Sequence, residues 1–192
     1  MRTVLFAAVL LLTAVSVSAN PVWNDEVVLE FEDGGNCSWP YVGQPVKVRV
    51  VLTEPVFAQE GISAFSFRVE RTFSAMLTSE TNLMGPPDFF LGSAEIDGMT
   101  CPASPDCATP DSHGRIPVAE LEYVFTGTPG TLTVLGHSTE GMAFVDCGLS
   151  QQWWNTYGER NVAGFGMEPP GGCHSASSVE DLSWGAIKAL YH

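Results

Sequence analysis

Hydrophobic and polar residues alternate along several short stretches of the chain, which is typical of β-strands that bury one face. In one of them, Phe65, Phe67 and Val69 share a face, while the residues between them are polar or charged. The predicted strands are VVLEF (27–31), PVKVRVVL (45–52), AFSFRVE (64–70), ELEYVF (120–125), TLTVLG (131–136) and the shorter MAFVDC (142–147).

Clusters of Gly, Pro, Ser and Asp separate these stretches, as turn segments do. They are EDGGN, MGPPD, CPASPDCATPDSHG and MEPPGG, and GTPG (127–130) joins two predicted strands with hairpin chemistry. No long amphipathic helix precedes the C-terminal end. The pattern therefore predicts an all-β fold, an antiparallel β-sandwich of the immunoglobulin/cohesin-like or jelly-roll kind.

The last part of the chain has a different pattern. Trp184, Ile187 and Tyr191 recur at helical spacing, after Ser178 at a capping position. We expect a Pro/Gly/Ser-rich linker over 166–177 and a short C-terminal helix over 178–192. Two interpretations stay open: the helix covers the sandwich, or it is a docking or sorting element.

The first 19 residues have the features of a secretory signal peptide. Arg2 supplies the positive charge, an apolar run follows, and Val17-Ser18-Ala19 fits a cleavage site. The apolar run is shorter than the roughly 20 residues of a spanning helix. We therefore expect export, with the sandwich domain occupying residues 20–165 and the protein secreted, extracellular or periplasmic.

The charge balance narrows the possible partners. The chain has 22 acidic and 8 basic residues and a net charge of −14, and loss of Arg2 with the leader makes it more negative. Such a surface repels phosphate backbones and anionic lipid headgroups. We expect no nucleic-acid partner and no transmembrane segment; a glycan or an extracellular protein remains as the partner, with the oligomeric state open.

Five cysteines follow the predicted leader, so two disulfides and one odd thiol are expected in an oxidising compartment. Spacing alone does not settle the pairing. We predict Cys101 with Cys107, across a short Pro-bearing loop, and Cys37 with Cys147, which leaves Cys173 unpaired.

Three segments carry a resemblance to known families: GQPVKVRVVLTEP, GISAFSFRVER and VAELEYVFTGTPGTLTVLG. Their order resembles cohesin-like and related carbohydrate-binding-module sandwiches over roughly residues 43 to 147. The chain is also similar to uncharacterised secreted bacterial proteins of comparable length that share an early Asn-Cys turn and a tail like SWGAIKALYH. The resemblance implies a β-sandwich and an extracellular location rather than a chemistry.

Catalytic and metal-binding motifs are absent from the sequence. The four histidines show no paired-ligand spacing, and no G-x-S-x-G motif occurs. Carboxylates at Asp97, Asp111, Glu120, Glu122, Asp146 and Glu159 are available to a glycosidase, and Asp97, Asp106 and Asp111 to Ca²⁺, but spacing supports neither. We predict no catalytic residue, no metal site and no cofactor.

The segment QQWWNTYGER (151–160) is the strongest candidate for a binding site. Trp153, Trp154 and Tyr157 lie beside amide and guanidinium groups, a mixture that sugar recognition uses. Adjacent strand residues point to opposite faces, so packing in the core is the competing interpretation. We therefore expect a secreted, non-catalytic binding or surface-structural protein. The alternatives are a carbohydrate-binding module that uses these aromatics, and a small secreted hydrolase.

Overall fold

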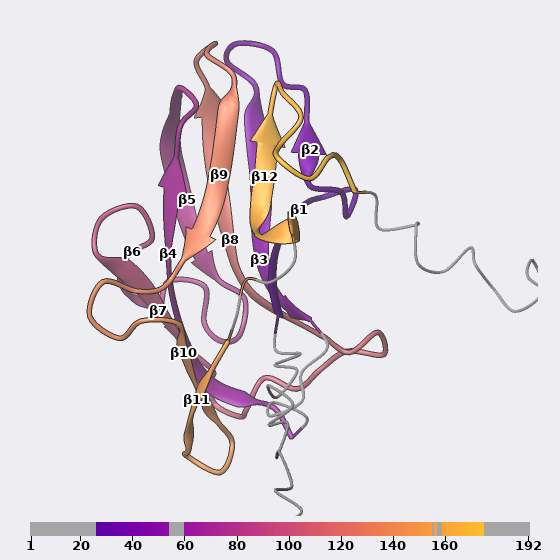
Figure 1. The fold of residues 1–192 in the computed structure, drawn as a ribbon. Coiled ribbons are helices and arrows are strands. Elements are labelled where there is room, and N and C mark those ends of the chain that lie inside the picture. Colours follow the sequence, from indigo (N-terminus) through magenta and orange to yellow (C-terminus); the bar gives the residue numbers. More distant parts are fainter. Residues whose placement is uncertain (1–25, 54–59, 155, 157–158, 175–192) are drawn as a thin grey trace, which may run out of the picture.

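The computed structural model describes residues 26–53, 60–154, 156 and 159–174, and in that part of the chain nearly all regular structure is β. The strands form two sheets that face each other (Figure 1). The predicted β-sandwich is therefore confirmed. The predicted helix over 178–192 and the leader over 1–19 lie outside the described residues.

The first sheet has four antiparallel strands in the order β1-β3-β8-β5. They are β1 (Glu26–Phe31), β3 (Pro45–Thr53), β8 (Arg115–Phe125) and β5 (Ala75–Asn82). Val48 of β3 pairs with Leu121 of β8, and both side chains are buried. The alternation in the sequence therefore reports the buried face of this sheet correctly.

The second sheet is larger and runs in the order β11-β10-β4-β9-β12-β2, with β7 and β6 attached beside β4. Phe65 of β4 pairs with Phe144 of β10 and also with Cys101 of β7, so those two strands flank β4 on opposite sides. The strands are β2 (Cys37–Ser38), β4 (Ile62–Arg71), β6 (Leu91–Ser93), β7 (Gly98–Pro102), β9 (Gly130–Leu135), β10 (Ala143–Asp146), β11 (Gln151–Trp153) and β12 (Val162–Phe165), with a short 3₁₀ turn η1 (Glu159–Asn161) before the last strand.

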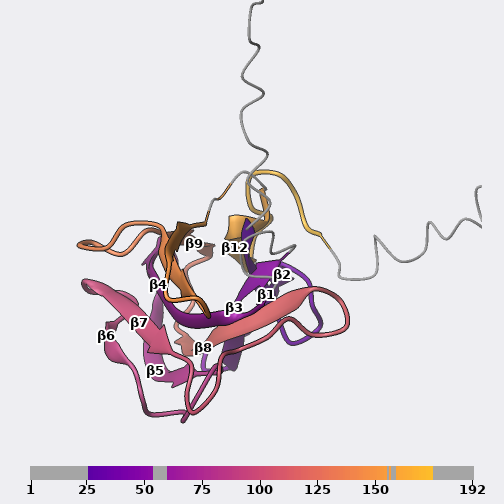
Figure 2. The same ribbon diagram turned by 90° about the horizontal axis from the view of Figure 1, so that it is seen from below.

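Aromatic side chains fill the space between the two sheets, which are seen edge-on from below in Figure 2. Phe73 stacks on Phe165 with ring centroids 3.9 Å apart, and Tyr123 meets both rings edge-on. A second group surrounds Phe65, which stacks on Phe144. Burial of such large apolar surfaces is the main stabilising term for a domain of this size.

The disulfides join Cys37 to Cys173 and Cys107 to Cys147, whereas Cys101 is a free, buried thiol. Both predicted pairings, Cys101 with Cys107 and Cys37 with Cys147, are therefore wrong. The register of β7 explains the first error, because Cys101 pairs with Phe65 and its side chain points into the core.

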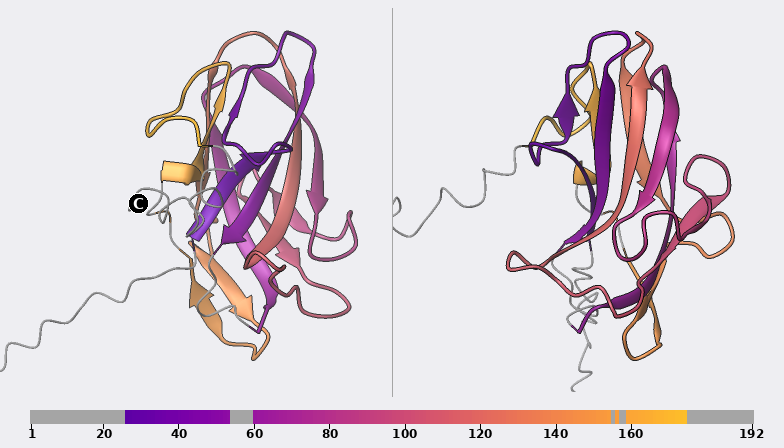
Figure 3. Two further views of the ribbon diagram at one scale, coloured as in Figure 1. Left: turned by 90° about the vertical axis from the view of Figure 1, so that its right-hand side faces the viewer. Right: turned by 180° about the vertical axis from the view of Figure 1, so that it is seen from behind.

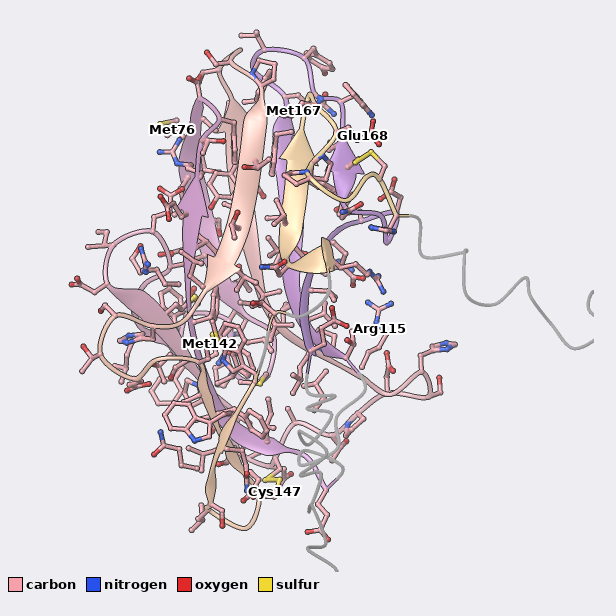
Figure 4. All side chains as sticks on the ribbon, in the orientation of Figure 1. Met76, Arg115, Met142, Cys147, Met167 and Glu168 are labelled. Atoms are coloured by element: carbon pink, nitrogen blue, oxygen red, sulfur yellow. A yellow bond between two sulfur atoms is a disulfide. The ribbon has the colours of Figure 1, made fainter. Side chains whose placement is uncertain are left out.

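The beginning of β4 brings Cys107 and Cys147 together. The amide of Cys147 donates to the carbonyl of Gly61 at 3.2 Å, and Ala108 exchanges backbone hydrogen bonds with Ile62. Chain segments on both sides of β4 therefore converge at its first residues, a proximity that sequence spacing does not reveal. Cys147 marks this end of the molecule in Figure 4.

The segment after β12 returns to β2. The amide of Gly166 donates to the carbonyl of Ser38, and Cys173 is bonded to Cys37. The buried side chain of Asn36 accepts from the amide of His174 at 2.6 Å. Residues 166–174 of the predicted linker are thus tied to the sandwich. Among the described residues, no helix is long and apolar enough to cross a membrane.

Candidate functional site

The two adjacent tryptophans at the end of β11 point in opposite directions. Trp153 is 52% exposed, whereas Trp154 is 2% exposed. Successive residues of an extended chain alternate between faces, so one indole faces solvent and the other the core. Of the predicted aromatic cluster, Trp153 remains available to a ligand, Trp154 is a core residue, and Tyr157 lies outside the described residues.

Trp154 is held in the core by stacking and by two hydrogen bonds. Its ring stacks on Phe65 with centroids 5.7 Å apart, and its indole nitrogen donates to the carbonyl of Ser66 at 3.1 Å. Its amide donates to the carbonyl of Met142. These contacts fix the end of β11 and thereby the direction of the neighbouring Trp153 side chain.

Trp153 stands at one edge of an outward-facing row of side chains that crosses five strands. It pairs with Ala143 of β10. Across β4, Ser66 pairs with Thr100 of β7, which in turn pairs with the exposed Leu91 of β6. Small side chains thus occupy the middle of this row and large exposed ones its two ends.

The middle of this surface is hollow. The depression has a volume of about 300 Å³, and small or polar side chains form much of its lining. It is lined by Ala64, Ser66, Thr100, Glu140, Ala143, Phe144, Val145 and Gln151. We call these residues, together with Trp153 and Leu91, the Trp153 face; its strands lie in the lower part of Figure 1 and are seen from two further sides in Figure 3.

Glu140 reaches the depression from the loop between β9 and β10, and His137 shapes that loop. The ring Nδ1 of His137 accepts hydrogen bonds from the amides of Thr139 and Glu140, at 3.2 and 3.3 Å. His137 and Gly141 also exchange backbone hydrogen bonds at 2.8 and 2.9 Å. The carboxylate is therefore presented from a closed, hydrogen-bonded loop.

The Glu140 carboxylate lies over the two hydroxyls of the central row. Its Oε2 accepts from the Ser66 hydroxyl and, at 3.3 Å, from the Thr100 hydroxyl. The two hydroxyl oxygens are 3.0 Å apart. Three polar groups from β4, β7 and the β9–β10 loop therefore converge in one place.

The same loop also supports the indole ring of Trp153. A methyl group at Gly141 would lie 3.4 Å from Cζ3 of Trp153, in ordinary contact with the ring. Gly141 has a φ of +72°, which favours glycine. One loop therefore positions both the aromatic ring and the carboxylate of the site.

Asp146 stabilises the turn that leads into β11. Its Oδ1 accepts from the Ser150 amide at 2.8 Å, and its Oδ2 from the side-chain amide of Gln152 at 3.1 Å. The hydrogen bond from Ser150, and then that from Gln152, lowers the pKa of Asp146. This carboxylate therefore acts as a hydrogen-bond acceptor that holds the turn.

Other carboxylates considered for catalysis are also engaged locally. Glu120 bridges Lys47 and Arg49 at 2.8 and 3.0 Å, and Asp111 accepts from the amides of His113 and Arg115. Within the described residues, no group of three His, Cys, Asp or Glu side chains is placed to hold a metal ion. Asp97, Asp106 and Asp111 are therefore not gathered into such a group.

The Trp153 face combines an exposed indole ring with a depression that is lined by a carboxylate acceptor, two hydroxyls and the side chain of Gln151. Such a surface can stack on an apolar ring face and exchange hydrogen bonds with hydroxyl groups. Ser66, Thr100 and Glu140 were not predicted from the sequence. Their approach depends on the strand order, and no local motif marks it.

Comparisons with known proteins give a structural likeness and no likeness in sequence. No protein-family model and no curated protein sequence matches the chain. A solved structure of the sixth cohesin of scaffoldin B from Acetivibrio cellulolyticus, in complex with a mutant Cel5 dockerin, is similar to it with a TM-score of 0.42 and 15% identity. The match covers 74% of this chain and 99% of that one.

Proposed function

We propose that this protein is an extracellular, non-catalytic binding module and that the Trp153 face binds carbohydrate. One observation carries the proposal: the exposed Trp153 pairs with Ala143, which lines a depression of about 300 Å³ together with Glu140. The two disulfides support an oxidising, extracytoplasmic location.

Sugar recognition needs both kinds of group found at this surface. The apolar face of a pyranose ring packs on an indole, while its hydroxyls donate to a carboxylate and exchange hydrogen bonds with amides and hydroxyls. The size of the depression lies at the lower end of the range for small-ligand sites, so a short stretch of a glycan fits it better than a large ligand.

A binding role fits the surface better than a hydrolytic one. Glycosidases use two carboxyl groups that flank the scissile bond. Glu140 is the one carboxylate among the residues that line the depression. The Ser66 hydroxyl donates to this carboxylate, and no histidine lines the depression to activate a serine.

The test is a glycan-array screen of the oxidised protein without its leader, with Trp153→Ala and Glu140→Gln as site variants. Trp39→Ala is the matched control, because Trp39 is also an exposed tryptophan and does not line the depression. We expect the site variants to lose at least about tenfold in affinity for the glycan that the wild type binds, and the control to retain it.

Two outcomes contradict the proposal. Absence of glycan binding by the folded wild type removes the carbohydrate assignment and favours a protein partner or a structural surface role. Equal glycan affinity of the wild type and Trp153→Ala would show that the glycan binds elsewhere on the molecule. Circular dichroism spectra of each variant establish that the fold is retained.

A further inference from the structure

The loop between β2 and β3 exposes three apolar side chains at the end of the sandwich opposite β10 and β11 (Figure 1). Trp39 is 68%, Tyr41 73% and Val42 68% exposed. An exposed apolar side chain on its own is ordinary, but three within four residues form a patch that suggests contact with another surface.

This loop is held by a hydrogen-bonded turn. The amide of Gln44 donates to the carbonyl of Tyr41 at 3.0 Å, and the Gln44 side chain accepts from the Tyr41 amide at 3.1 Å. Gly43, with a φ of +86°, donates to the carbonyl of Phe125 at 2.8 Å. The three side chains therefore project from a preorganised backbone, which lowers the entropic cost of binding.

Neighbouring segments extend this surface. A methyl group at Gly127 would lie 3.2 Å from Cγ2 of Val42, so the β8–β9 hairpin contacts the loop. Gly166 donates to the carbonyl of Ser38 and lies beside Pro129. We call residues 39–44, 126–130 and 165–167 the neutral cap; Met167, labelled in the upper part of Figure 4, belongs to it.

The neutral cap contains no charged residue, although the chain carries 30 of them. No Asp, Glu, Lys or Arg occurs over 34–46, 123–139 or 161–167. Charged residues border the cap: Glu32, Asp33 and Lys47 line a depression together with Trp39, and Glu168 follows Met167. The loops that carry Tyr41 and Val42 are themselves free of charge.

We infer that the neutral cap inserts into the interfacial region of an uncharged lipid bilayer. Tryptophan and tyrosine favour the membrane–water interface, and loops without charged residues avoid the main cost of entering it. The cap side chains protrude from the surface, so they can enter a fluid bilayer directly. A protein partner would need a pocket that matches them. The net charge of −14 opposes adsorption to anionic lipids, so zwitterionic lipids are the predicted surface.

Flotation of the oxidised protein without its leader, mixed with phosphatidylcholine vesicles, tests the inference. We expect the wild type to float with the vesicles and the Trp39→Ala, Tyr41→Ala double variant to partition at least about tenfold less. Ile96→Ala is the matched control, because Ile96 is an exposed aliphatic residue outside the neutral cap; this variant should float like the wild type.

Three results overturn the inference: a wild type that stays with the soluble fraction, a double variant that floats equally well, or binding that requires anionic phosphatidylglycerol. The inference is independent of glycan binding. Trp153→Ala should leave flotation unchanged, while the cap variant should retain any glycan affinity, so the two proposals fail separately.

Discussion

The indole nitrogen of Trp154 donates a hydrogen bond to the backbone carbonyl of Ser66, 3.1 Å away, from the inner face of the larger sheet. The side chain of the same Ser66 lies on the outer face, where it donates to Glu140. The contact thus links β4 with the segment after β11. It places a core tryptophan directly beneath the surface on which the neighbouring Trp153 is exposed.

Replacing the two tryptophans one at a time should separate stability from binding. Trp154→Ala removes a buried ring and leaves a cavity beside Phe65, so we expect the free energy of unfolding to fall by about 3–5 kcal/mol. Trp153→Ala should change it by less than about 0.5 kcal/mol, since the side chain is half exposed. Urea unfolding followed by circular dichroism measures both values. A larger loss for Trp153→Ala than for Trp154→Ala would show that the assignment of the two faces is reversed.

Much of the sandwich could be predicted because buried strands leave a strong local pattern. The stretch predicted at 45–52 forms β3 (Pro45–Thr53), and that at 64–70 lies within β4 (Ile62–Arg71). The strands that were missed lack the pattern for identifiable reasons. Strand β5 (Ala75–Asn82) is a largely polar edge strand, and β11 and β12 are three and four residues long.

The candidate site was only partly predictable. Trp153 was found because aromatic residues beside amides are visible in the sequence itself. Glu140 and Thr100 were not, because their proximity to Ser66 depends on which strands become neighbours. The disulfide pairing failed for the same reason: Cys101 lies near Cys107 in the sequence, but its strand directs the thiol into the core.

Removing either disulfide should destabilise the domain, and the long-range one more strongly. The Cys37–Cys173 bridge spans 136 residues and Cys107–Cys147 spans 40. The loop-entropy model assigns them about 5 and about 4 kcal/mol, respectively. The paired variants Cys37→Ser, Cys173→Ser and Cys107→Ser, Cys147→Ser, compared by urea unfolding, measure this order. Peptide mapping without reduction provides the control, because recovery of a Cys101–Cys107 peptide would contradict the pairing described above.

The buried thiol of Cys101 should make the protein less stable at alkaline pH. Burial, and then the negative charge of Glu80, raises the pKa of Cys101 to about 12, whereas a thiol in the unfolded chain titrates near 9.0. Between those values the unfolded state loses a proton that the folded state retains, so the free energy of unfolding falls by about 1.4 kcal/mol per pH unit. This contribution is fully present below pH 9 and is lost as the pH rises toward 12.

Comparison with Cys101→Ala isolates that contribution. Burial also raises the pKa of Tyr123, and the hydrogen bond between Lys47 and Glu120 raises the pKa of Lys47. Both groups are present in the wild type and in the variant, so their contributions cancel in the comparison. Denaturant unfolding from pH 8 to 10.5 should therefore give a shallower decline for the variant. Parallel curves for the two proteins would show that the thiol titrates normally in the folded state.

The buried side chain of Asn36 should be one of the most sensitive polar positions in the domain. Its amide nitrogen donates to the carbonyls of Val162 and Gly172 at 3.2 and 3.3 Å, and its oxygen accepts from the His174 amide. Asn36→Ala removes these hydrogen bonds to partly buried backbone groups, which costs about 1–3 kcal/mol for each group that water does not reach.

We expect Asn36→Ala to lower the free energy of unfolding by about 3 kcal/mol or more and to increase hydrogen exchange at the amides of Gly164 and His174. Ser38→Ala is the control, since Ser38 lies on the same short strand and its contact with Gly166 is made by its backbone carbonyl. If the two variants are equally stable, the Asn36 side chain does not hold the segment after β12, which leaves the Cys37–Cys173 disulfide and the backbone hydrogen bonds. The Cys37→Ser, Cys173→Ser protein should then lose protection at His174, whereas Asn36→Ala should not.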